Sequence, residues 1–213
     1  MNVVLALAAF GRTQFQSPST RSAGLFALDF SEQELGRRAM PVWLFDAEPV
    51  QIPPPRRETP EQWADRWFTR EFQEPAGREM FRGRRRLAPV LRAVLDLCAA
   101  SEDLPTVALV YLPEDPLDGP DVLRVLREAA DRPVFCVFLT EADGEQLAGL
   151  PPRQPGAPRN FTVIRAGDWS SAWARARRTR TTRRAVSQWL RGLPLPDDTV
   201  DLSDAPAEPT GTH

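Results

Sequence analysis

Short, uninterrupted apolar runs alternate along the chain with longer amphipathic stretches. Runs that are apolar at every position are typical of β-strands buried on both faces. Such strands are predicted over residues 2–9, 41–45, 106–112, 133–140 and 161–165, and residues 49–52 are predicted as a hairpin partner or edge strand.

Between these strands the apolar residues follow helical spacing. The clearest predicted helix has an apolar face made of Leu87, Val90, Leu91, Val94, Leu95 and Cys98. Further helices are expected over residues 118–130 and 169–190, with a turn or short helix near 143–150. Residues 11–23 are polar and predict a loop that enters a short helix over 19–28.

A capping signal predicts one more helix start. Thr59 stands before Pro60, and Gln62 follows three residues after the threonine, as in a capping box. The helix places four aromatic residues towards one side, namely Trp63, Trp67, Phe68 and Phe72. Core packing is expected for them, and a partly exposed docking patch is the alternative.

Buried strands that alternate with amphipathic helices predict an α/β fold: a doubly wound, mostly parallel sheet with helices on both faces. We expect one domain over residues 1–193 and an acidic, disordered tail over residues 194–213, which is almost without large apolar residues. In such sheets a ligand site lies beyond the carboxyl ends of the strands, where the strand order reverses.

Composition removes most of the groups that enzymes use. The chain has no lysine, its single histidine is the last residue, His213, and its single tyrosine is Tyr111. A histidine base, a lysine Schiff base and a phosphate-binding lysine are therefore excluded, so we expect no enzyme activity. The net charge of −2 gives no whole-molecule argument for binding nucleic acid.

Residues 1–10 are apolar but too short to span a bilayer, and they lack the basic start of a signal peptide. A cytoplasmic protein without a membrane partner is expected. Cys98 and Cys136 are expected to be buried, reduced packing residues, since they lack the spacing of metal ligands.

Several segments together resemble a known family. They are residues 40–46 (MPVWLFD), 83–95 (GRRRLAPVLRAVL), 105–112 and 118–137. The chain resembles, over roughly residues 2–191, the bacterial von Willebrand factor A-like domains, of the type found with tellurium-resistance and related stress gene clusters. The resemblance implies a Rossmann-like fold.

The resemblance also implies a place for a divalent cation, the metal-ion-dependent adhesion site at the strand carboxyl ends. The positions that match its ligands are Ala8, Phe10, Arg12, Arg85 and Pro113. None of these residues is a good magnesium ligand, because that ion needs oxygen donors. We therefore expect a degenerate site with no metal and no other cofactor.

Two of these positions hold arginines, each with a permanent positive charge. Arg12 and Arg85 would replace part of the lost charge and pair with Asp46, Glu114 or Asp115, or else would point to solvent. The expected function is a non-catalytic protein-interaction module, an adaptor or structural subunit of a bacterial stress- or defence-type multiprotein system. The candidates for binding a protein partner that offers carboxylates are Arg12, Asp46, Arg84, Arg85, Arg86, Glu114 and Asp115.

Two alternatives come from other classes of function. An anion- or nucleic-acid-binding protein would use an arginine-rich helix with Arg177, Arg178, Arg183 and Arg184. A metal-dependent enzyme would need a shifted cation site among Glu114, Asp115, Asp118 and Asp121. Acidic residues in a loop that leads into a helix are more often caps and dipole partners, which we favour here.

Overall fold

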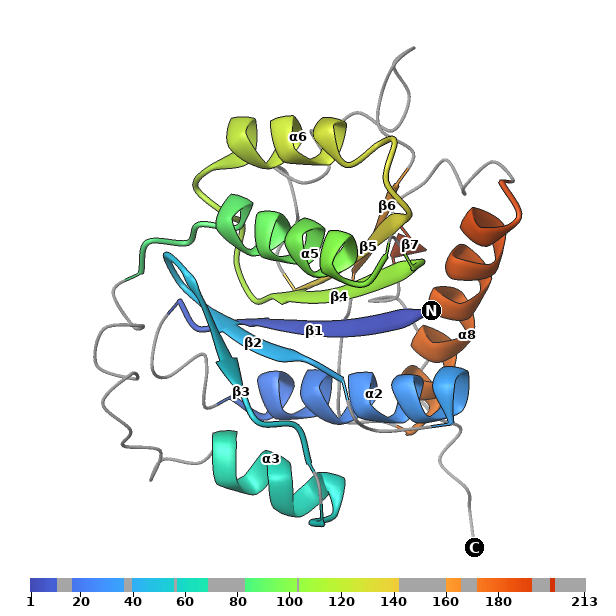
Figure 1. The fold of residues 1–213 in the computed structure, drawn as a ribbon. Coiled ribbons are helices and arrows are strands. Elements are labelled where there is room, and N and C mark those ends of the chain that lie inside the picture. Colours follow the sequence, from blue (N-terminus) through green and yellow to red (C-terminus); the bar gives the residue numbers. More distant parts are fainter. Residues whose placement is uncertain are drawn as a thin grey trace, which may run out of the picture.

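The strands form one seven-stranded sheet in the order β3-β2-β1-β4-β5-β6-β7 (Figure 1). The computed structural model describes residues 1–10, 17–36, 40–55, 57–68, 83–102, 104–141, 160–165, 172–192 and 200–201. The strands are β1 (Asn2–Ala8), β2 (Val42–Phe45), β3 (Pro49–Ile52), β4 (Thr106–Leu112), β5 (Val134–Thr140), β6 (Phe161–Arg165) and β7 (Val200–Asp201). The helices are α2 (Pro18–Leu35), α3 (Pro60–Phe68), α5 (Ala88–Ala100), α6 (Gly119–Glu128) and α8 (Ala172–Leu190).

All neighbouring strands are parallel except β2 and β3, which pair antiparallel, so the predicted mostly parallel sheet is confirmed. Strand β1 lies between β2 and β4, with Leu5 opposite Val42 on one side and Leu109 on the other. The chain therefore moves outward in both directions from β1. The carboxyl ends of β1, β2 and β4 meet where the strand order reverses, which is the usual place for a ligand site in this architecture.

Helices cover both faces of the sheet, as predicted. On one face Leu5 and Leu7 belong to a core that also holds Phe26 of α2 and Val186 of α8. On the other face Ala6 belongs to a second core, with residues of α5 and α6. Figure 1 shows α5 and α6 together on one side of β1 and β4, and α2 and α3 on the opposite side. Because successive strand residues point to opposite faces, the continuous apolar runs supply both cores.

Helix α2 is longer than the predicted 19–28 helix and begins inside the predicted loop. Ser17 is its N-cap, whose hydroxyl accepts a hydrogen bond from the Thr20 N–H at 3.2 Å, and Pro18 occupies the first turn. At the other end Gly36 adopts φ 64° and its N–H donates to the Glu32 carbonyl at 2.8 Å. The serine–proline start and the glycine at the end are ordinary helix signals. The predicted start of this helix was wrong because the polar composition of residues 11–23 was interpreted as a loop.

The capping box of α3 is confirmed. The Gln62 N–H donates to the Thr59 hydroxyl at 3.2 Å, and the Thr59 N–H donates to the Gln62 side-chain oxygen at 2.9 Å. Trp63, Trp67 and Phe68 are all buried, which agrees with the core interpretation, whereas Phe72 lies outside the described residues.

The end of the chain differs in part from its prediction. Val200 and Asp201 lie within the predicted disordered tail, yet they form β7 and pair parallel with Ile164 and Arg165 of β6. Alternation of apolar and acidic residues is compatible with a strand at a sheet edge, and the acidic composition concealed this. The remaining tail residues and the segment 143–158 lie outside the described part of the chain.

Cys98 and Cys136 are buried free thiols, as predicted. No helix in the described ranges combines the length and the apolar character needed to cross a bilayer.

Candidate functional site

Three connecting segments meet at the carboxyl ends of the central strands. The first follows β2 and contains Asp46, the second leads into α5 and contains Arg85, and the third links β4 to α6 and contains Asp118. They are far apart in sequence, and the parallel order of β2, β1 and β4 brings them to one edge of the sheet. We call them the strand-end loops.

Asp46 joins the first loop to the second. Its side chain is 1% exposed, and its Oδ1 accepts a hydrogen bond from the Arg85 backbone N–H at 3.0 Å. Its carbonyl oxygen accepts another from the Arg86 N–H at 2.7 Å. A buried carboxylate needs such donors to offset the loss of its hydration. Asp46 therefore holds the first loop to the second through hydrogen bonds with backbone N–H groups. This role was not predicted from the sequence.

Arg85 joins the second loop to the third. Its guanidinium forms an ion pair with Glu114, and its carbonyl oxygen accepts a hydrogen bond from the Leu117 N–H at 2.9 Å. The residue adopts φ 48°, a left-handed conformation that is uncommon for a side chain of this size. Such backbone strain persists only where surrounding contacts hold it, and it gathers at functional sites. The predicted pairing of Arg85 with an acidic neighbour is thus present, and Glu114 is that neighbour.

Asp118 completes the connection from the α6 side. Its two carboxylate oxygens accept hydrogen bonds from the Leu87 and Ala88 N–H groups, each at 2.9 Å. These N–H groups belong to the first turn of α5, where backbone donors lack helical partners and the helix dipole favours a negative charge. The cap of α5 therefore comes from a residue thirty positions away.

Among the positions that the resemblance matched to metal ligands, those that the structure describes hold no ligand cluster. Ala8 is fully buried, and Phe10 is 4% exposed and meets the Phe45 ring edge-on at 5.6 Å between centroids. Apolar packing therefore occupies this end of β1. Arg12 lies outside the described residues.

The four acidic residues considered for a shifted cation site do not face one common point. Glu114 pairs with Arg85, both oxygens of Asp118 face backbone N–H groups, and Asp121 pairs with Arg124. Asp115 lies beside them with a buried Oδ1 that has no hydrogen-bond partner among the described residues. In the described ranges no three histidine, cysteine or acidic side chains are grouped as metal ligands.

Comparison with solved structures supports the fold. A structure described as von Willebrand factor type A from Catenulispora acidiphila superposes on 87% of this chain with a TM-score of 0.52, at 13% sequence identity. The fold is of the von Willebrand factor A type. The chain spans 42% of the length of that structure. No protein-family model and no curated protein matches the sequence.

Within this von Willebrand A-type fold, a polar group that the sequence did not reveal lies at the end of β4. Tyr111 is fully buried, and burial, followed by the negative charge of Glu141, raises the pKa of its hydroxyl. Hydrogen bonds with Thr20 and Ser19, at the start of α2, act in the opposite direction. The Tyr111 hydroxyl is therefore protonated at neutral pH.

These buried acids lead to a prediction for alkaline pH. Burial raises the pKa of the Cys136 thiol from its ordinary value of 9.0 to about 12. Between these two values the unfolded chain loses the proton and the folded chain retains it, so the free energy of unfolding falls as pH rises. We expect urea unfolding to show this fall above pH 9, and Cys136→Ala to make it shallower. An equally steep fall in the variant would exclude Cys136 as its cause.

The four arginines of the anion-binding alternative do not form one solvent-facing surface. Arg178 is 1% exposed, whereas Arg183 and Arg184 are exposed. Arg183 also donates to Glu34 at 2.6 Å and to Gln33 at 3.1 Å, and so fastens α8 to α2. Arg177 is half-buried and is not free, since it interacts with another part of the protein. On this helix arginine serves packing and helix pairing as much as surface charge.

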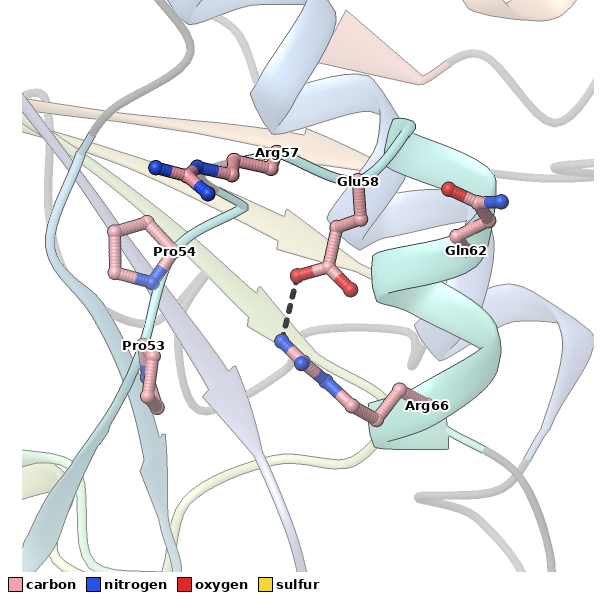
Figure 2. A pocket seen from close by; sticks show the side chains of 6 residues that line it. All are labelled: Pro53, Pro54, Arg57, Glu58, Gln62 and Arg66. Atoms are coloured by element: carbon pink, nitrogen blue, oxygen red, sulfur yellow. Dashed lines mark hydrogen bonds and ion pairs between the residues drawn. The ribbon is translucent and has the colours of Figure 1, made fainter.

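A hollow of about 780 Å³ lies between the chain after β3 and helix α3, away from the residues that the sequence singled out. Figure 2 shows the side chains of Glu58 and Arg66 meeting between the prolines and the helix, joined by an ion pair of 2.6 Å. Its other lining residues are Pro53, Pro54, Arg57 and Gln62. The ion pair neutralises two of the three charged side chains that line the hollow and leaves Arg57 without an ion pair among the described residues.

Proposed function

We propose that the chain is a non-catalytic protein-interaction module whose strand-end loops are held together by protein atoms in place of a divalent cation. It would serve as an adaptor or structural subunit of a bacterial multiprotein system of the stress or defence type. One observation carries the proposal: Asp46, Arg85 and Asp118 connect three loops at the place where the resemblance implies a divalent cation.

The chemistry of these contacts supports the metal-free interpretation. The carboxylate of Asp118 accepts two backbone hydrogen bonds, and Asp46 accepts one at its carboxylate and one at its carbonyl. Magnesium binding would need such oxygens free to form an octahedral shell. The guanidinium of Arg85 also brings a fixed positive charge to this region, which opposes the entry of a cation. Loops fixed in this way can present side chains to a partner without the entropic cost of ordering them at binding.

Metal independence gives the first test. Adding magnesium or manganese, or treating the protein with EDTA, should leave the thermal midpoint within about 1 °C, because a ligand raises stability only if it binds the native state. Differential scanning calorimetry of the full chain measures this. A midpoint that rises with magnesium concentration would contradict the metal-free proposal.

Capture of partners gives the second test. The tagged full chain is expressed in its native host, and co-purifying proteins are compared in the presence and absence of EDTA. A stoichiometric partner should remain bound in EDTA and be lost with Arg85→Ala, which removes the Glu114 ion pair. Recovery of the chain alone, or loss of the partner in EDTA with wild-type protein, would refute the proposed function.

A further inference from the structure

The N-terminal halves of α5 and α6 and the loops before them carry a basic surface. Its basic residues are exposed arginines, namely Arg84, Arg86, Arg92 and Arg124. Asp121 lies among them: hydrogen bonding by Arg124 is the main cause of its lowered pKa, and Arg86 and Arg92 contribute through their charge. Arg86 lies just before α5, Arg92 lies on α5 and Arg124 lies on α6, and these two helices pack side by side (Figure 1), which places the three guanidinium groups on neighbouring elements.

Most of this positive charge is unused inside the molecule. Asp121 pairs with Arg124, whereas Arg84, Arg86 and Arg92 form no ion pair with any residue that the structure describes. Asp96 and Glu128 lie one helical turn beyond Arg92 and Arg124 and limit the surface on that side.

An exposed leucine accompanies the arginines. Leu117 is 61% exposed, more than the exposed Leu104 (48%) and Leu190 (51%). Its backbone is not loose, because its N–H donates to the Arg85 carbonyl at 2.9 Å and the next residue, Asp118, caps α5. A single exposed leucine is unremarkable by itself. Here, however, the Leu117 backbone is hydrogen-bonded to Arg85, between Arg84 and Arg86, which form no ion pair within the described part of the chain. Arginine is among the residues enriched in interface hot spots, and Leu117 adds an apolar contact beside it.

We propose that this α5–α6 basic surface, formed by Leu117, Arg84, Arg86, Arg92 and Arg124, binds an acidic protein segment that presents an apolar side chain to Leu117. The inference rests on the proposed function and names the chemistry of its partner. Carboxylates on the segment would pair with Arg84, Arg86 and Arg92, and the apolar contact would set its register. Arginine suits this role because its planar fork pairs with carboxylates through two hydrogen bonds.

The same surface is less suited to single-stranded nucleic acid. Such ligands are held by aromatic side chains that stack on bases as well as by charge. None of the five residues of the surface is aromatic, and Leu117 offers an apolar contact where a phosphate chain offers none.

Two matched peptides test the proposal on the full-length protein. One is a labelled glutamate peptide with a single central leucine, and the other carries serine in place of that leucine. At low salt we expect the leucine peptide to bind about tenfold more tightly, as burial of one leucine contact would give. Leu117→Ser should remove this difference and leave the affinity for the serine peptide unchanged. Fluorescence anisotropy measures both affinities.

Reversing the charge of two arginines of the α5–α6 basic surface provides a second test. Arg86→Glu with Arg92→Glu should weaken both peptides at least tenfold and reduce their dependence on salt. Arg180→Glu is the matched control, since Arg180 is an exposed arginine on α8, and it should leave both affinities unchanged. Circular dichroism confirms that each variant is folded.

Several outcomes would overturn the inference. They are no binding of either peptide, equal binding of the two, or an unchanged leucine preference in Leu117→Ser. Tighter binding of oligothymidylate than of the leucine peptide, lost in Arg86→Glu, would assign the surface to nucleic acid instead. If the co-purified partner resists EDTA and also tolerates Arg86→Glu with Arg92→Glu, the proposed function stands and this surface is not its site.

Discussion

Trp63→Ala should lower the free energy of unfolding by about 3–5 kcal/mol, the largest effect that we expect from a single substitution in this protein. Trp63 is fully buried, and its ring meets that of Phe68 edge-on at 5.4 Å. Its indole N–H donates to the Pro53 carbonyl at 2.8 Å. The substitution would leave a large cavity, and it would also leave a carbonyl without its partner.

The neighbourhood of Trp63 has little freedom to collapse into that cavity. A Cβ at Gly24 of α2 would lie 2.9 Å from the Phe68 ring and 3.3 Å from the Trp63 ring, so the helices already approach each other closely there. Urea unfolding followed by circular dichroism measures the loss. Arg66→Ala is the control on the same helix: it removes a partly exposed ion pair and should cost less than about 1 kcal/mol. Similar small losses in both variants would mean that α3 is not part of the cooperative core.

Asp118→Ala should cost about 2–3 kcal/mol, because it removes two charge-assisted hydrogen bonds and the cap of a helix that starts elsewhere in the chain. The variant leaves the Leu87 and Ala88 N–H groups without their acceptor. It also breaks the connection between two strand-end loops. We therefore expect weaker partner binding as well as lower stability, and urea unfolding gives the stability change directly.

Two further variants separate the cap from simple loss of charge. Asp118→Asn retains one carbonyl acceptor and should recover about half of the lost stability. Asp121→Ala removes an acidic residue from the first turn of α6, where its exposed pairing with Arg124 adds little. If Asp121→Ala proves as harmful as Asp118→Ala, the effect comes from general charge and not from the cap.

The strands could be predicted because their signal is local. A run such as Thr106–Leu112 is apolar at every position, and burial on both faces is its simplest explanation. The capping box at Thr59 was likewise visible within four residues. The start of α2 was missed although Ser17 and Pro18 carry its signal, because the surrounding polar residues outweighed them. Residues Val200 and Asp201 were missed because a two-residue strand is defined by its neighbour β6.

The site could be predicted only in part, since its contacts join distant segments. The sequence left open whether Arg85 pairs with an acidic residue or points to solvent, and the ion pair with Glu114 shows that it pairs. The sequence alone could not show that Asp118 caps α5. Whether a loop carboxylate caps a helix or binds a metal depends on which backbone N–H groups lie near it in the folded chain. The exposure of Leu117 was also hidden, since a leucine beside a proline-rich loop gives no sign of whether it is covered.

The short pairing of β7 with β6 affects how fragments of this protein should be made. Composition suggests trimming the chain at residue 194, where large apolar residues become rare. That cut would remove Val200 and Asp201 and leave the edge of β6 at Ile164 and Arg165 without a paired strand. Unpaired strand edges invite other chains to add on, so the trimmed protein should aggregate more readily than one ending beyond residue 201.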